Sequence, residues 1–333
     1  MIKLDRCPSL LIMGHATYSP KAIRNLFGGN NVSHLMPFSS PATDPDSIEP
    51  INNAGRLSLS GAQPKFGMII DSDKKLHYST KGIHSTYILK PRPIGYHLIN
   101  HDFCAANENL TMQMASQIYG IETAENGLCF FDDEQPAYLT KRFDINGMEK
   151  FAQEDFASLM GLSKDNGGSD FKYNNGSYEE CADIIRQFVK ASTIDILRLY
   201  RIILYNFITL NDDAHLKNFS LIKINCEYRL TPAYDLINTS LHVYEPRLFA
   251  LERGLFREGM SFSDTKSISY KDFAEFGRRI GLPEKLYINE LARFSAHNKL
   301  ADELIDRAFL SKDLIKAYKL SMHHRQLLIK PFN

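Results

Sequence analysis

Two polar side chains with the spacing of a phosphoryl-transfer site stand out in this chain. Asp213 and Asn218 are five residues apart and follow the apolar stretch 202–210. A carboxylate can position an acceptor hydroxyl and take its proton, and an amide oxygen can hold a magnesium ion that neutralises phosphate charge. An Asp and an Asn at this spacing are more often capping residues of a solvated loop, so the pair needs support from elsewhere in the chain.

The residues after this pair predict a β-hairpin that leads to a second carboxylate. Two short strand-like runs, 220–224 and 228–230, flank residues 225–227, and the chain then reaches Asp235. Protein kinases place their second metal-binding aspartate just after such a hairpin. The order of the elements therefore favours a kinase-like site over a capped loop.

Upstream residues supply candidates for phosphate binding. The small residues of 55–61 would let backbone N–H groups approach phosphate oxygens, although a plain turn is the simpler interpretation of that stretch alone. Lys90 ends a predicted strand, and Glu108 lies on a predicted helix over 101–119. A lysine and a glutamate at such positions are often merely solvated, but kinases need this pair to hold the nucleotide phosphates.

Taken together, the motifs resemble the HipA family of serine/threonine kinase toxins, from about residue 50 to residue 240. The stretches that carry the resemblance are Ser-Gly-Ala-Gln-Pro-Lys at 60–65, Ser-Thr-Tyr-Ile-Leu-Lys-Pro at 85–91, Asn-Glu at 107–108, Asn-Asp-Asp-Ala-His-Leu-Lys-Asn-Phe-Ser at 211–220 and Leu-Thr-Pro-Ala-Tyr-Asp at 230–235.

The resemblance implies ATP and Mg²⁺ as cofactors. It makes Asp213 the catalytic residue and Asn218 and Asp235 the metal ligands, while Lys90 binds the α/β-phosphates and Glu108 orients it. Adenine would lie along strand 140–144. His215 is expected to support the catalytic loop by hydrogen bonding, a structural role that is favoured over proton transfer. The residues expected at the ATP site are Ser60, Gly61, Ala62, Gln63, Lys65, Lys90, Glu108, Lys141, Phe143, His215, Lys217, Asn218 and Asp235.

The same resemblance implies a substrate and partners. A serine of an aminoacyl-tRNA synthetase would be phosphorylated, tryptophanyl-tRNA synthetase for the short HipT type that this chain resembles most. About half of the usual N-terminal region precedes the glycine-rich loop, so we expect a separate HipS-like protein to replace the missing subdomain. A HipB-like helix-turn-helix protein would be the DNA-binding partner. Ser58 and Ser60 are predicted sites of self-phosphorylation.

Composition narrows the function classes. The 333 residues contain 39 Lys plus Arg and 39 Asp plus Glu, so the zero net charge gives no basis for direct DNA binding. Five scattered cysteines without a Cys-x-x-Cys pair suit a reducing compartment. Since no apolar run reaches the roughly 18–20 residues that span a bilayer and no signal peptide is evident, we expect a cytoplasmic protein without membrane contact.

The predicted fold is α+β, with the two lobes of a protein kinase. Residues 1–54 would form an irregular segment and linker, 55–143 a β-rich N-lobe, and 144–333 a helical C-lobe in which strands are expected only at 220–230. Residues 163–177 are predicted to be a long polar loop that faces the substrate. The predicted C-lobe helices are 154–162, 178–191, 193–210, 270–280, 284–299 and 311–327.

Two alternatives stay open on the sequence. One is a small-molecule or lipid kinase, because a fold does not fix a function. The other is a catalytically silent kinase fold that only binds partners, which the intact set of Lys90, Asp213, Asn218 and Asp235 argues against.

Overall fold

A five-stranded antiparallel sheet forms the first half of the protein in the computed structural model, which describes residues 3–41, 63–80, 84–94, 98–147 and 149–331. The strand order is β2-β1-β3-β5-β4, and Lys90 at the end of β3 lies opposite Tyr138 of β5. The bounds are β1 Phe66–Ile70, β2 Leu76–Tyr78, β3 Tyr87–Lys90, β4 Asn126–Phe130 and β5 Pro136–Lys141.

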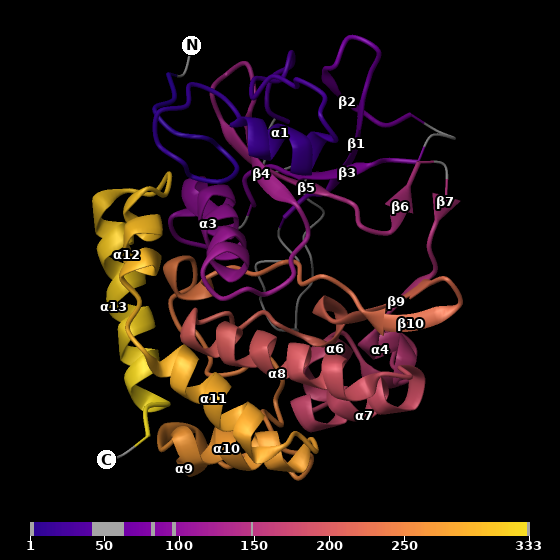
Figure 1. The fold of residues 1–333 in the computed structure, drawn as a ribbon, viewed down its shortest axis with the longest axis vertical. Coiled ribbons are helices and arrows are strands. Elements are labelled where there is room, and N and C mark those ends of the chain that lie inside the picture. Colours follow the sequence, from indigo (N-terminus) through magenta and orange to yellow (C-terminus); the bar gives the residue numbers. More distant parts are fainter. Residues whose placement is uncertain (1–2, 42–62, 81–83, 95–97, 148, 332–333) are drawn as a thin grey trace.

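The N-terminal segment covers one face of this sheet (Figure 1). Its helix α1, Pro20–Phe27, begins at the Ser19 N-cap and buries Leu26 and Phe27 in the same apolar cluster as Leu89 and Leu139 of the sheet. The segment before residue 42 therefore shares the core of the sheet. The predicted boundary between residues 54 and 55 lies outside the described residues.

Helix α3, Cys104–Gln117, packs against β4 and β5 and carries Glu108. The 3-10 turn η2, His101–Phe103, precedes it directly. The observed helix is therefore a few residues shorter at each end than the predicted helix over 101–119. Polar residues are buried along α3, and they are held by neighbouring elements. Gln113, for example, donates to the side-chain oxygen of Asn126 at 3.1 Å.

The second half is mainly helical and is built around the buried helix α8, Ser192–Ile208, which packs against α7, α11 and α13. The predicted helix 284–299 is wrong in one respect. The α11 helix ends at Ser295, and α12 starts anew behind the Asn298 N-cap. The other helices are α4 Phe156–Leu159, α7 Tyr178–Phe188, α9 Phe262–Lys266, α10 Tyr270–Arg279, α11 Glu284–Ser295, α12 Lys299–Asp306 and α13 Lys312–Leu328, with the 3-10 turns η3 Leu216–Asn218 and η4 Thr239–Leu241.

Two predictions about the junction between the halves are wrong. The first is that strands would occur after residue 144 only at 220–230. The predicted hairpin is present as β9, Ser220–Ile224, and β10, Glu227–Leu230, but a third strand, β8, Gln153–Asp155, pairs with β9. In addition, β6, Ile145–Asn146, pairs with β7, Glu149–Lys150. The predicted loop 163–177 contains two one-turn helices, α5 Lys164–Gly167 and α6 Phe171–Asn174.

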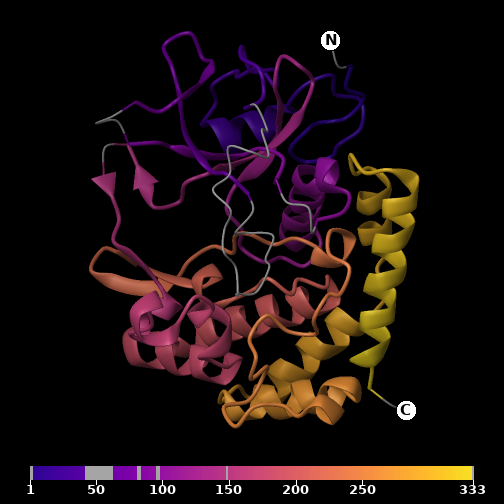
Figure 2. The same ribbon diagram turned by 180° about the vertical axis from the view of Figure 1, so that it is seen from behind.

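Seen from both sides, the sheet and the helical half are stacked, and α12 and α13 run along one flank beside both (Figures 1 and 2). The α+β division into a β-rich and a helical lobe is as predicted. Among the described residues, no helix is long and apolar enough to cross a membrane.

Candidate active site

A buried lysine joins the two lobes at the centre of the site. The Lys90 ammonium lies 2.6 Å from Oε1 of Glu108 on α3 and 2.5 Å from Oδ1 of Asp235, which follows the β9–β10 hairpin. Lys90 and Glu108 are only 4% and 2% exposed. The structure thus brings together three predicted residues that are up to 145 positions apart.

Charge pairing opposes the effect of burial throughout this triad and prevails at Lys90 and Asp235. Burial alone would lower the pKa of Lys90, but the carboxylates of Asp235 and Glu108 outweigh burial and raise that pKa above its ordinary value. Burial would likewise raise the pKa of Asp235, but Lys90 and then Lys65 hold it far below its ordinary value. For Glu108 burial wins, and its pKa is raised although Lys90 acts against it.

The backbone places Asp235 under the sheet. Ala233 accepts a hydrogen bond from the N–H of Ala124 at 2.9 Å and donates to the carbonyl of Glu122 at 2.8 Å, so the segment before Asp235 is tied to the connection between α3 and β4. Asp235 itself has a φ of 55°, in the left-handed region that Asp tolerates better than most residues. Such conformations persist where the surroundings hold them, which is frequent at functional sites.

Asp213 lies in a loop that Thr239 holds in place through Leu210 and Asp212. The Thr239 hydroxyl donates to the carbonyl of Leu210 at 2.6 Å and accepts from the N–H of Asp212 at 3.1 Å. Asp213 is 6% exposed, and its Oδ1 accepts a 2.5 Å hydrogen bond from the Tyr173 hydroxyl. Tyr173 belongs to α6, so the segment predicted to be a polar loop reaches into the site.

His215 supports the site by packing against Tyr173 and not through its ring nitrogens. Its ring nitrogens are buried without a hydrogen-bond partner among the described residues, and the ring instead packs edge-on against Tyr173 with centroids 4.9 Å apart. Burial, with Lys172 nearby, lowers the pKa of His215 well below its ordinary value. The predicted side-chain hydrogen bonding is not seen. The backbone N–H of His215 donates to the carbonyl of Asp213 at 2.8 Å instead.

Asn218 and Asp235 both line one small cavity. The Asn218 amide nitrogen donates to the carbonyl of Asp213 at 3.1 Å, which leaves the amide oxygen as the group able to hold a cation. An amide oxygen and an ionised carboxylate are ligands that Mg²⁺ accepts, so these two residues fit the ion that the sequence implied.

The remaining predicted residues differ in how close they lie to the triad. Lys65 lies 3.4 Å from Asp235, and Gln63 donates to the carbonyl of Pro91 at 3.0 Å, so both lie beside the triad. Lys217 is paired with Asp155 at 2.5 Å, and the Phe143 ring packs against Tyr234 with centroids 5.7 Å apart. Lys141 carries its charge near Glu125 and is not linked to the triad by a described contact. Ser58, Ser60, Gly61 and Ala62 lie outside the described residues.

Sequence reasoning missed two residues of the site. Besides Tyr173, the half-buried Lys172 faces Asp213, and burial together with the ammonium groups of Lys65 and Lys217 lowers its pKa against the pull of Asp213. The available signal was the apolar spacing of Phe171 and Tyr173 within an otherwise polar stretch.

A buried histidine supports α3 from below. His242 accepts a hydrogen bond from the Asn107 amide at 2.8 Å through Nε2, and its Nδ1 donates to the carbonyl of Ile99 at 3.2 Å, an assignment that follows from the network. Burial lowers the pKa of His242 from 6.5 to about 4. The neutral ring therefore holds Asn107, the neighbour of Glu108, in place.

Comparison with known proteins agrees with this geometry. A family model described as a HipA-like C-terminal domain matches residues 57–302. The chain is 28% identical over 336 residues to a Haemophilus influenzae protein named "Putative kinase", with 94% of both chains covered. It is 27% identical over 258 residues to the serine/threonine-protein kinase toxin HipA of Shewanella oneidensis, which covers 72% of this chain and 55% of that protein.

The fold is also similar to a solved structure. The complex of Shewanella oneidensis HipA, HipB and operator DNA contains a chain that superposes with a TM-score of 0.66 at 23% identity, covering 86% of this chain and 68% of that chain. The chain thus spans about two thirds of that chain's length. The match confirms the predicted two-lobed, kinase-like α+β fold. With most of its length matched by the family model, the chain belongs to the family of proteins with a HipA-like C-terminal domain.

Proposed function

We propose that the protein is a serine/threonine protein kinase that transfers the γ-phosphate of ATP to a protein hydroxyl. The observation that carries the proposal is the buried Lys90, held between Glu108 and Asp235. A lysine fixed in this way presents a positive charge to nucleotide phosphates. Its second ion pair, with Glu108, holds the ammonium group in place, so that its position does not depend on Asp235 alone.

The residues around this lysine suit an in-line transfer. The acceptor oxygen bonds to the γ-phosphorus, the bond from that phosphorus to the β–γ bridging oxygen breaks, and ADP leaves. The acceptor proton passes to Asp213, whose carboxylate has lone pairs beyond the one that Tyr173 occupies. Bound magnesium would neutralise phosphate charge beside Asn218 and Asp235. Lys172 and Lys65 add positive charge on the same side.

The proposed substrate is a serine of an aminoacyl-tRNA synthetase, tryptophanyl-tRNA synthetase in the first instance, with blocked charging and growth arrest as the outcome. This rests on the resemblance to HipA-type toxins and on the relative named as a HipA toxin. Self-phosphorylation at Ser58 or Ser60 is proposed on the same resemblance.

The proposed partners are a HipB-like antitoxin and a HipS-like small protein. The solved complex of HipA with HipB and operator DNA supports the first. With 39 basic and 39 acidic residues, this chain has no excess charge for DNA, so the antitoxin would supply DNA binding. The HipS-like partner rests on the sequence resemblance alone.

Phosphoproteomics after brief induction tests the proposal in cells. Cells that express the wild-type chain should gain phosphoserine on a synthetase, and cells that express an Asp235→Gln variant at the same level should not. Phosphate that appears on a lipid or a small molecule and on no protein would overturn the proposed substrate class. Equal protein phosphorylation in the two strains would overturn the assignment of the site.

A further inference from the structure

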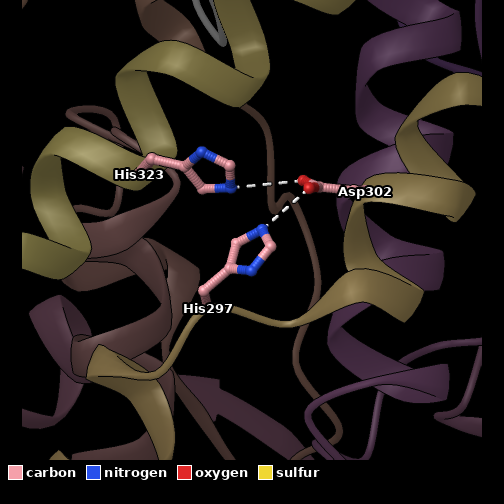
Figure 3. Close-up of side chains that lie close together, drawn as sticks. All are labelled: His297, Asp302 and His323. Carbon is pink, nitrogen blue, oxygen red and sulfur yellow. Dashed lines mark hydrogen bonds and ion pairs between the residues drawn. The ribbon is translucent and has the colours of Figure 1, made fainter.

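Two histidines and an aspartate gather on the C-terminal helices, and none of them belongs to the candidate active site. His297 follows α11, Asp302 lies on α12 and His323 lies on α13. Figure 3 shows the two imidazoles and the carboxylate pointing toward one another. Nε2 of His297 is 2.8 Å from Oδ2 of Asp302, Nε2 of His323 is 3.2 Å from Oδ1, and one ligand atom of each residue lies within 4.8 Å of the others.

We propose that His297, Asp302 and His323 bind a divalent transition-metal ion, with zinc as the expected one. Bonds of about 2.1 Å in a tetrahedral site place ligand atoms about 3.4 Å apart. The ligand atoms here lie within 4.8 Å of one another, so small rotations of the side chains would reach that spacing. Two imidazoles and one carboxylate suit zinc, whereas magnesium and calcium prefer oxygen ligands throughout. The side chains are 53%, 24% and 37% exposed, so they can make small adjustments, and water can fill the fourth position.

The simpler alternative is a surface ion-pair network, which would contribute little to stability. The orientation of the rings favours the metal site. The centroids of the two imidazole rings are 4.7 Å apart, and the ring planes make an angle of 76°. Each ring directs its Nε2 to the carboxylate of Asp302. Two nitrogen atoms and a carboxylate therefore converge on one centre from three separate segments of the chain (Figure 3).

Buried contacts hold two of these segments in place before any ion binds. Gln326 lies three residues after His323 on α13 and is 3% exposed. Its amide donates to the carbonyl of Phe294 at 3.1 Å and to that of Ala296, just before His297, at 2.9 Å. These bonds fix the backbone before His297 relative to the helix that carries His323.

The ion would brace the pair of helices that runs along both lobes. Lys319 and Asp306, each one turn from a proposed ligand, already link α13 to α12 at 2.7 Å. The α12 helix packs against α3, and the Tyr318 hydroxyl of α13 lies 2.9 Å from that of Thr111 on α3 (Figures 1 and 2). Coordination would add a stronger link between α12 and α13 next to these contacts.

Metal titration of the full chain, stripped of metal and free of any histidine tag, tests the proposal. Calorimetry should show one zinc ion bound per chain, and cobalt should give the visible absorption of a tetrahedral site. At a hundredfold excess of zinc over its dissociation constant, the unfolding midpoint of the 333-residue chain should rise by about 4 °C.

Matched variants locate the binding. His297→Gln and His323→Gln should each weaken zinc binding at least about tenfold and abolish the cobalt absorption. The control His324→Gln, which removes the exposed neighbouring histidine, should change neither. Circular dichroism of each variant checks that the helices form. The absence of zinc binding, or equal binding by the ligand variants and the control, would overturn the proposal and leave an ion-pair network.

Discussion

Replacing Lys90 by methionine isolates the charge balance on which the site depends. Methionine fills a similar volume without the ammonium group, so Glu108, which is 2% exposed, loses its partner. A buried carboxylate left alone takes up a proton rather than remain charged. Asp235 is affected less, since its side chain is 20% exposed and Lys65 lies 3.4 Å away.

The cost of that protonation follows from the ordinary Glu pKa of 4.5. Holding Glu108 neutral at pH 7, while the unfolded chain ionises, lowers the free energy of unfolding by about 3 kcal/mol. At pH 5 the same cost is only about 1 kcal/mol, because the unfolded carboxyl is then partly protonated as well. The destabilisation by Lys90→Met should therefore shrink as the pH falls.

Urea unfolding of a double-mutant cycle measures this effect. Lys90→Met/Glu108→Gln carries no buried charge at the pair and should be within about 1 kcal/mol of the wild type, with the pH dependence removed. Glu108→Gln alone should cost less than Lys90→Met, since Lys90 keeps Asp235. If Lys90→Met were as stable as the double variant at both pH values, Glu108 would not be a buried partner of Lys90 and the reasoning would fail.

Three further predictions concern the surroundings of the site. Tyr173→Phe removes one hydrogen bond to the proposed catalytic carboxylate and should lower kcat about tenfold with little change in KM for ATP; an unchanged kcat in steady-state kinetics would count against a positioning role. His242 takes up a proton near pH 6.5 in the unfolded chain but only near pH 4 in the folded chain, so the free energy of unfolding should fall by about 2 kcal/mol between pH 7 and pH 5. Urea unfolding of His242→Gln should show a weaker pH dependence. An unchanged dependence in that variant would assign the effect to another group. Phosphate at Ser58 or Ser60 would repel the nucleotide, so Ser60→Asp should weaken ATP binding in calorimetry and Ser60→Ala should not. Equal affinities of the two variants for ATP would show that these serines do not regulate nucleotide binding.

Periodicity and turn chemistry were sufficient to predict most of the elements. The helices α8, α10 and α13 have enough residues for their apolar repeats to show. The three-residue β8 is too short for any repeat and exists because its backbone pairs with β9. The break between α11 and α12 had a local signal in Asn298, which caps Leu300, but the apolar pattern continues across it.

The site was predictable where its chemistry is encoded by short motifs and not where it depends on packing. The resemblance to HipA-type kinases singled out Lys90, Glu108 and Asp235, and the structure brings them into contact. The contact of Tyr173 with Asp213 spans 40 residues and depends on the docking of α6, which no local pattern determines.

The most direct test of the account is the transfer of labelled γ-phosphate from ATP to protein by the purified chain. The assay compares the wild type with Asp213→Gln, whose neutral amide cannot take up the acceptor's proton. The wild type should label itself or an added synthetase in the presence of magnesium, and Asp213→Gln should lose at least about a thousandfold in rate with its unfolding midpoint nearly unchanged. Labelling of protein at equal rates by both forms would contradict the central claim, as would a well-folded wild type that transfers phosphate to no protein.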